Sequence, residues 1–300
     1  MASFALKQSP VRTWLSATLK LVSLFALLLA AGVHADVLRC SDANGKTIYT
    51  DNRALCRNDE TKSLSLDTRA KASPVNKGKI DYRIPERQYE SVGANYTVFI
   101  EHDLLEGDAR LATQATQKLE ATLTEIFSVL PQVPAQKLCQ LTFYLMWGEA
   151  SPKGGRKSGM SYIRPGEPKN YSYLDPRWEN VIVVYSAKNL MYLDSLWSKK
   201  ALMHELAHAW HLNNWPENYE PIVSAYRNAK DLGLYRNVKD SKGKIIKEAY
   251  AIKNHLEYFA ELSAIYFVGG NYFPFDREAL RINDGLGVRI LDLLWGSGHI

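Results

Sequence analysis

Two histidines and a glutamate form the pattern in this chain that could most directly do chemistry. They lie in the segment His204-Glu205-Leu206-Ala207-His208. On an α-helix, residues four apart lie on the same face one turn apart, so both imidazoles could bind a single Zn²⁺ ion. Glu205 would then lie beside the ion, where a carboxylate can take a proton from metal-bound water. The alternative is an ordinary surface helix that carries two histidines.

The surrounding sequence predicts a helix, because the neighbours are mainly apolar and neither Gly nor Pro falls between Ser195 and Trp215. A zinc site needs a further ligand, and residues 254–262 again have apolar side chains at helical spacing. Glu257 and Glu261 lie four apart in that segment. Two carboxylates on a partly apolar face repel each other, and a cation removes that conflict. The alternative is a solvated acidic stripe on a surface helix.

Together, the two motifs resemble those of the gluzincin metallopeptidases. The second block, Tyr250-Ala-Ile-Lys-Asn254-His-Leu-Glu257-Tyr-Phe-Ala-Glu261, is similar to the matching block in the catalytic domain of anthrax lethal factor and its secreted relatives. The continuation to Phe275 is similar to a bacterial and fungal branch of those relatives. The likeness covers about residues 158–280 and is strongest in the two motif blocks.

This resemblance implies a role for each motif residue. It implies one Zn²⁺ ion per chain, bound by three side chains: His204, His208 and Glu257. Three protein ligands leave a position open for water, as in catalytic zinc sites. The resemblance also implies Glu205 as the general base and the Tyr250 hydroxyl as the donor to the oxyanion. Glu261 would orient a ligand histidine without touching the ion.

Another class of zinc peptidase fits the sequence less well. A metzincin needs Gly three residues after the second motif histidine and a further His three residues later. Those positions hold His211 and Asn214. We expect His211 to be a surface histidine at the end of the helix, and an extra polar contact in the cleft is the alternative.

The site residues therefore predict a secreted zinc metallopeptidase that hydrolyses peptide or protein substrates with metal-activated water. Two alternatives stay open. One is a zinc hydrolase of cell-wall peptide cross-links, which would use the same ligands, and the other is a catalytically silent, peptidase-like binding module. The presence of Glu205 and Tyr250 argues against a silent module. The sequence favours no particular oligomeric state.

The first 35 residues have the pattern of a signal peptide. Basic side chains come first: Lys7, Arg12 and Lys20. An apolar run at 21–33 follows, and Val33-His34-Ala35 offers small residues for cleavage. The run is short for a bilayer span, although an uncleaved anchor is the alternative. We expect export, and no membrane span after cleavage.

The charge balance excludes a nucleic-acid partner. The chain has 37 Lys and Arg and 32 Asp and Glu, a formal net charge of +5. Without the basic residues of the expected signal peptide, the net charge is about +2. A nucleic-acid-binding domain normally carries a much stronger basic patch.

Four segments are expected along the chain: a signal peptide at 1–35, a small β-hairpin module at 36–62, a linker at 63–92 and the catalytic domain at 93–300. The module resembles a small β unit at the N-termini of proteobacterial envelope proteins, which implies a periplasmic or secreted protein of a Gram-negative bacterium. Cys40 and Cys56 flank this unit and are the natural disulfide pair after export. Cys139 is expected to be a buried thiol on a strand at 137–147.

The predicted fold class is α+β and zincin-like, with a small sheet packed on the His-Glu-x-x-His helix and a helical C-terminal part. Further strands are expected at 96–100, 159–163 and 181–185, and further helices at 109–130, 217–231 and 285–295. Strand 159–163 is a candidate edge strand, to which an extended peptide could add. Pro216 suits the first turn of helix 217–231. The Gly-rich segment 153–157 lacks phosphate-loop spacing and is expected to be a flexible cleft loop.

Overall fold

A computed structural model of the chain describes residues 38–41, 47–50, 62–63, 80–83 and 87–296. The chain divides into two compact units, Met1–Lys77 and Gly78–Ile300, and each is described by itself. The expected signal peptide at 1–35 lies outside the described residues. Cys56 and the side chain of Cys40 lie outside them too, so the expected disulfide stays a prediction.

The first unit contains a small antiparallel sheet with the strand order β2-β1-β3. Its strands are β1 (Leu38–Ser41), β2 (Thr47–Thr50) and β3 (Lys62–Ser63). Leu38 lies opposite Thr50 and Ser41 opposite Thr47. This pairing is the hairpin that the sequence predicts for the N-terminal module.

The second unit is built on a five-stranded sheet with the order β4-β5-β6-β8-β7. The strands are β4 (Tyr89–Ser91), β5 (Thr97–Glu101), β6 (Thr142–Leu145), β7 (Met160–Ile163) and β8 (Val181–Val184). The central strands β5, β6 and β8 are parallel, whereas β4 and β7 pair antiparallel at the two edges. The predicted edge position of β7 is confirmed.

Both faces of this sheet are buried. Along β6, Phe143 and Leu145 belong to the core shared with the helices, and Tyr144 lies on the opposite face with Tyr82 and Trp178. Successive side chains of a strand point to opposite faces, so one strand serves both cores. Parallel strands covered on both faces are apolar throughout, and this explains the run Val181–Val184.

Helices make up most of the second unit. The N-terminal half contains α1 (His102–Gly107), α2 (Ala109–Val129), α3 (Gln132–Leu138), α4 (Glu167–Asn170) and α5 (Ala187–Tyr192). The C-terminal half contains α6 (Ser195–Asn214), α7 (Glu220–Asp231), the 3₁₀ turn η2 (Tyr250–Ile252), α8 (His255–Phe267), α9 (Arg277–Asn283) and α10 (Gly285–Trp295). A hairpin of β9 (Arg236–Lys239) and β10 (Ile245–Glu248) precedes η2.

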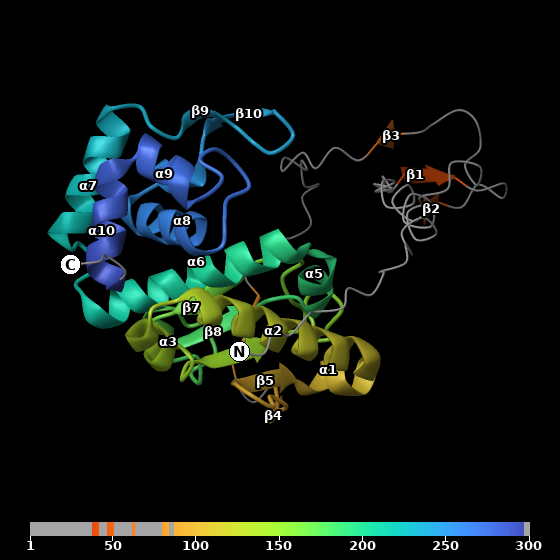
Figure 1. Ribbon diagram of the computed structural model, residues 1–300. Helices are drawn as coiled ribbons and strands as arrows, with labels where there is room; N and C mark the ends of the chain where they lie inside the picture. Colours follow the sequence, from red (N-terminus) through yellow and green to blue (C-terminus); the bar gives the residue numbers. More distant parts are fainter. Residues whose placement is uncertain (1–37, 42–46, 51–61, 64–79, 84–86, 297–300) are drawn as a thin grey trace, which may run out of the picture. The chain divides into compact units, whose positions relative to one another are not determined.

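Helix α6 lies in the middle of this unit (Figure 1). It contacts α2 and strand β7 on one side and packs along α8 on the other. The coarse prediction of a mixed α+β fold is thus confirmed. Within the ranges that the structure describes, no helix combines the length and apolar character needed to cross a bilayer.

Side-chain caps fix where the two central helices begin. The Asp194 carboxylate accepts a hydrogen bond from the Trp197 backbone N–H at 2.8 Å, which starts α6. The Asn254 side-chain oxygen accepts one from the Glu257 backbone N–H at 2.9 Å, which starts α8. Such caps satisfy N–H groups that have no partner within the helix. They also set which side chains each helix presents to the other.

The predicted linker at 63–92 extends too far along the chain. Tyr82 is 1% exposed within the second core, and β4 pairs with β5. The compact unit therefore begins at Gly78 rather than at residue 93. A three-residue strand shows no periodicity, so the sequence pattern could not distinguish β4 from a linker.

In the predicted strand at 137–147, residues 137–141 do not form a strand. Helix α3 continues to Leu138, and the strand itself covers only Thr142–Leu145. Cys139 ends α3, is half-buried, and donates a weak hydrogen bond from Sγ to the Gln136 carbonyl at 3.4 Å. It is therefore not the buried strand residue that we expected. Alternating apolar residues at the end of a helix imitate the start of a strand.

Two loop expectations are also corrected. Helix α7 begins at Glu220 and carries Pro221 in its first turn, so Pro216 lies before the helix. The loop at 153–157 is held at its start, because the Arg87 guanidinium donates to the carbonyls of Lys153 and Gly154. Arg87 itself is fully buried and paired with Glu101. These hydrogen bonds hold the loop against the sheet, so it is not the flexible cleft loop that we expected.

Candidate metal centre

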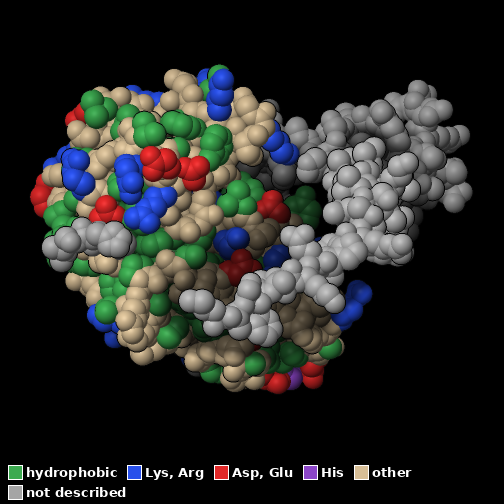
Figure 2. All heavy atoms as spheres, in the orientation of Figure 1, with side chains coloured by type: hydrophobic (Ala, Val, Ile, Leu, Met, Phe, Trp, Pro, Cys, Tyr) green, Lys and Arg blue, Asp and Glu red, His purple; other side chains and the backbone are tan. Residues whose placement is uncertain are grey.

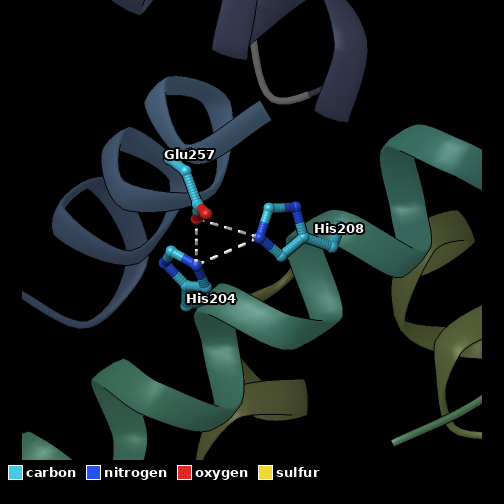
Figure 3. Close-up of side chains that lie close together, drawn as sticks. All are labelled: His204, His208 and Glu257. Carbon is cyan, nitrogen blue, oxygen red and sulfur yellow. Dashed lines mark hydrogen bonds and ion pairs between the residues drawn. The ribbon is translucent and has the colours of Figure 1, made fainter. Parts of the chain in front are cut away.

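Helices α6 and α8 bring together three side chains that could hold a metal ion (Figure 3). The Nε2 atoms of His204 and His208 lie 3.0 Å apart. Glu257 Oε2 lies 3.0 Å from the first of these nitrogens and 3.3 Å from the second. These separations are short because the groups hydrogen-bond to one another, and all three ligand atoms lie within 4.8 Å of one another.

The local helix geometry explains this convergence. His204 and His208 are four apart on α6, so their rings project from one face, at ring centroids 4.7 Å apart. Glu257 lies in the first turn of α8, directly after the Asn254 cap. Because α8 packs along α6, that first turn faces the two rings. Residues about fifty positions apart in the chain thus meet at one point.

The electrostatics of the group suit a cation. Burial lowers the pKa of His204, but the hydrogen bonds to Glu257 and Glu261 outweigh it and raise that pKa to about 9. Burial raises the pKa of Glu257, yet its hydrogen bonds to the two histidines hold it well below the usual value. The site therefore favours positive charge between these groups. Two imidazole nitrogens and one carboxylate oxygen are a donor set that zinc accepts.

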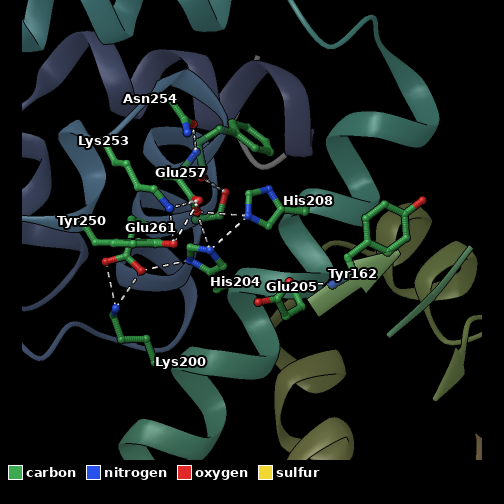
Figure 4. A network of polar contacts seen from close by, with 12 residues as sticks. Tyr162, Lys200, His204, Glu205, His208, Tyr250, Lys253, Asn254, Glu257 and Glu261 are labelled. Carbon is green, nitrogen blue, oxygen red and sulfur yellow. Dashed lines mark hydrogen bonds and ion pairs between the residues drawn. The ribbon is translucent and has the colours of Figure 1, made fainter. Parts of the chain in front are cut away.

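The Glu205 carboxylate lies next to this group, on the side of the sheet (Figure 4). Its Oε2 accepts a hydrogen bond at 2.7 Å from the backbone N–H of Tyr162, a residue of the edge strand β7. The N–H of Tyr162 thus points away from β8 and toward the candidate site. This bond fixes the carboxylate beside His204 and links the site to the edge of the sheet.

Tyr250 and Lys253 cover the other side of Glu257. The Tyr250 hydroxyl donates to Glu257 Oε1 at 3.0 Å and accepts from the Lys253 ammonium at 2.8 Å. Lys253 also donates to Glu257 Oε1 at 3.2 Å. Partial burial raises the pKa of Tyr250, even though Lys253 opposes this effect. The phenol is therefore a neutral hydrogen-bond donor at neutral pH.

Glu261 lies behind His204. The motif resemblance implies that this acid orients a ligand histidine. Its Oε1 is 2.9 Å from His204 Nδ1, and the carboxylate is 3% exposed. Both oxygens also accept from the Lys200 ammonium at 2.8 Å, and Oε2 accepts from the Tyr272 hydroxyl. Burial raises the pKa of Glu261, but the Lys200 charge and the bond to His204 outweigh it and lower the pKa to about 2.

A cavity of about 470 Å³ opens beside the candidate site. His204, Glu205 and Tyr250 line it together with Trp197 of α6, Ile246 of β10 and Tyr272 of the loop beyond α8. Figure 2 shows a hollow near the middle of this face, with basic and acidic side chains on its floor and hydrophobic ones at its rim. A small segment of a larger molecule could enter such a space.

Sequence reasoning missed three polar residues of this network: Lys200, Lys253 and Tyr272. The first two could have been found, because Lys200 precedes His204 by four residues and Lys253 precedes Glu257 by four. Tyr272 reaches Glu261 from a loop beyond α8, and no spacing rule predicts that contact.

The expectation for His211 is wrong. Its side chain is fully buried, and its ring packs edge-on to Phe259 at 5.5 Å. Nε2 donates to the Pro216 carbonyl at 3.2 Å, while Nδ1 has no hydrogen-bond partner among the described residues. His211 lies on the side of the last turn that packs against α8, whereas Asn213 and Asn214 of the same turn are exposed. The cluster that could hold a metal does not include His211.

We expect His211 to make the fold sensitive to acid. Burial lowers its pKa to about 4, from 6.5 in an exposed histidine. Below pH 6.5 the unfolded chain binds a proton that the folded chain refuses, so the stabilisation present above pH 6.5 is lost as the pH falls toward 4. The loss is at most about 3 kcal/mol. Urea unfolding of the chelator-treated protein at pH 7 and pH 5 measures the part of this loss that falls above pH 5.

The matched variant for this prediction is His211→Gln, which keeps a donor near Pro216 and cannot titrate. Its free energy of unfolding should fall less between pH 7 and pH 5 than that of the unsubstituted protein. An equal fall in the two proteins would show that His211 does not carry the acid sensitivity.

Comparison with known protein families finds a match in the N-terminal part of the chain. A domain of unknown function, DUF4124, matches residues 24–75. The match includes the predicted β-hairpin module and lies outside the candidate metal centre. No curated protein and no solved structure matched the chain.

Proposed function

We propose that this chain is an exported, zinc-dependent metallopeptidase with a zincin-like catalytic domain. The observation that carries the proposal is the meeting of His204, His208 and Glu257 on two packed helices, with Glu205 next to the first histidine. Two imidazoles and one carboxylate leave room for water, as catalytic zinc sites require. A closed structural site would use a fourth protein ligand, usually cysteine.

The chain's own residues supply the remaining steps of peptide hydrolysis. When bound, zinc would polarise the scissile carbonyl and make its water acidic near neutral pH. Glu205 would accept the water proton and pass it to the leaving amine. The Tyr250 hydroxyl, held near Glu257, can turn to donate to the developing oxyanion. Glu261 keeps His204 oriented.

The edge strand favours a peptide as substrate. β7 lies at the border of the sheet and pairs only with β8, and the Tyr162 N–H on its open side reaches Glu205. An extended peptide that adds to this edge would therefore pass directly beside the candidate catalytic groups. The neighbouring cavity could accept one of its side chains.

The proposed location is the periplasm or the medium of a Gram-negative bacterium. It is supported by the signal-peptide pattern of residues 1–35 and by the envelope-type module that follows. In that compartment a Cys40–Cys56 disulfide could form and stabilise the module.

The proposal is tested by metal analysis and by substrate profiling of the purified protein. We expect about one zinc per chain, cleavage of some members of a peptide library, loss of cleavage with a chelator and recovery with added zinc. Glu205→Gln in the same preparation separates this activity from a contaminating peptidase. A protein that neither retains zinc nor cleaves any peptide would overturn the proposal.

Tyr250→Phe should lower turnover by about two to three orders of magnitude while zinc stays bound. The reason is that the variant loses one donor to the oxyanion and keeps every proposed ligand. Tyr171→Phe is the matched control, since Tyr171 is also partly exposed and does not line the cavity. Steady-state kinetics and zinc content decide the question. Unchanged turnover would remove Tyr250 from the mechanism.

A further inference from the structure

A lysine lies almost fully buried behind the candidate metal centre. Lys200 is 6% exposed and lies one turn before His204 on the same face of α6. Its ammonium is 2.8 Å from both oxygens of Glu261. The rings of Trp197 and Tyr272 flank it, with centroids 5.7 and 5.4 Å from Nζ. A buried ammonium is costly, so its partners must compensate for the lost water.

The contacts of Lys200 hold the Glu261 carboxylate in one orientation. Oε1 is shared between Lys200 and His204 Nδ1, and Oε2 between Lys200 and the Tyr272 hydroxyl. A carboxylate with donors on both oxygens cannot rotate without breaking one of these bonds. Oε1 is therefore kept within hydrogen-bond distance of His204 Nδ1.

This arrangement determines which nitrogen of His204 faces the candidate ligands. When Nδ1–H donates to Glu261, the lone pair of Nε2 is left for the position between His208 and Glu257 (Figure 4). A histidine ligand is usually held in this way by a carboxylate behind it. Here, the carboxylate is itself held by an ammonium and a phenol.

The charges of the group lead to the same conclusion. Glu205, Glu257 and Glu261 are three acids around one buried histidine, and Lys200 neutralises the one that is most deeply buried. An ion pair that served only to join two helices could be replaced by apolar side chains with little loss. The Lys200 pair differs, because its acid also contacts His204.

We propose that Lys200 is a positioning residue for the metal, acting through Glu261 and assisted by Tyr272. Lys200 does not touch the ion; it fixes the carboxylate that orients His204. This inference rests on the proposed zinc function and adds to it a determinant of metal affinity that lies outside the His-Glu-x-x-His motif.

The test is the zinc affinity of the full chain, measured by competition with a chromophoric chelator. Lys200→Met keeps the length of the side chain and removes its charge, and its zinc affinity should fall by about 10–100-fold. Lys199→Met is the matched control, because Lys199 is the adjacent residue of α6 and pairs with the exposed Glu125 of α2. The control should bind zinc as the unsubstituted chain does.

A double substitution separates positioning from a general loss of structure. If Lys200 acts through Glu261, Lys200→Met combined with Glu261→Gln should weaken binding no more than Glu261→Gln alone. The absorption spectrum of the cobalt-substituted protein should also change in Lys200→Met and not in Lys199→Met. Additive losses with an unchanged cobalt spectrum would show that Lys200 is only structural.

Tyr272→Phe keeps the inference testable even with a poorly folding Lys200→Met protein, since it removes a single hydroxyl from the same carboxylate. It should weaken zinc binding several-fold. Equal zinc affinity of the unsubstituted chain, Lys200→Met and Tyr272→Phe would overturn the inference and leave the proposed function intact. Absence of zinc binding in the unsubstituted chain would instead overturn the proposed function.

Discussion

Glu205→Gln should lose about two to four orders of magnitude in peptide hydrolysis while it retains its zinc. This range is typical for the loss of a general acid–base group. Glutamine has nearly the same shape as glutamate, and its amide oxygen can still accept the hydrogen bond from the Tyr162 N–H. The fold and the three proposed ligands are therefore unchanged, and only the capacity to take and return a proton is removed.

The measurement compares kcat/KM on a cleaved peptide with the zinc content of the same sample. Glu125→Gln is the matched control, because it makes the same change on an exposed surface of α2. Full activity in Glu205→Gln would exclude Glu205 as the base. Loss of zinc in Glu205→Gln would instead place Glu205 among the ligands.

The central part of the site could be predicted from the sequence because it depends on local geometry. Residues four apart on a helix share a face, so the pairing of His204 with His208 follows from their spacing alone. The ends of α6 were predictable for a similar reason, since Asp194 caps its start and apolar residues continue to its last turn. The motif resemblance supplied the one long-range element, the contact with Glu257.

The parts that could not be predicted depend on tertiary packing. His211 was expected at the surface, but its side of α6 packs against α8, where its ring meets Phe259. The burial of Lys200 has the same cause, because only the packing of α8 brings Glu261 to its ammonium. Strand β4 is too short to show a hydrophobic period. Tyr82 covers the second face of the sheet from a segment far from the motifs in the sequence, so no motif indicates its position.

The proposed ligands are surrounded by partners that the motif does not describe. The motif resemblance describes three ligands, a base, the Tyr250 donor and Glu261 next to a ligand histidine. The structure adds Lys200 and Tyr272, which hold Glu261 behind His204, and Lys253, which contacts both Tyr250 and Glu257. Two of the three proposed ligands thus have a charged partner that limits their rotation: His204 has Glu261, and Glu257 has Lys253. A site held in this way needs little rearrangement when an ion binds.

Glu257→Ala should abolish stoichiometric zinc binding and, with it, hydrolysis. The substitution removes one of three proposed ligands, so the loss of affinity should exceed the 10–100-fold typical of groups that only orient a ligand. The helix should persist, because the Asn254 cap bonds to the backbone N–H of residue 257 and not to its side chain.

Glu248→Ala provides the control, since Glu248 is an exposed acid that lines the same cavity and is not one of the three proposed ligands. Zinc content after dialysis, together with helix content from circular dichroism, distinguishes loss of the ion from loss of the fold. Zinc should stay bound in Glu248→Ala and be absent from a folded Glu257→Ala protein. A folded Glu257→Ala protein that keeps one zinc per chain would show that the acid of α8 is not a ligand, and the gluzincin type of site would then have to be abandoned for this chain.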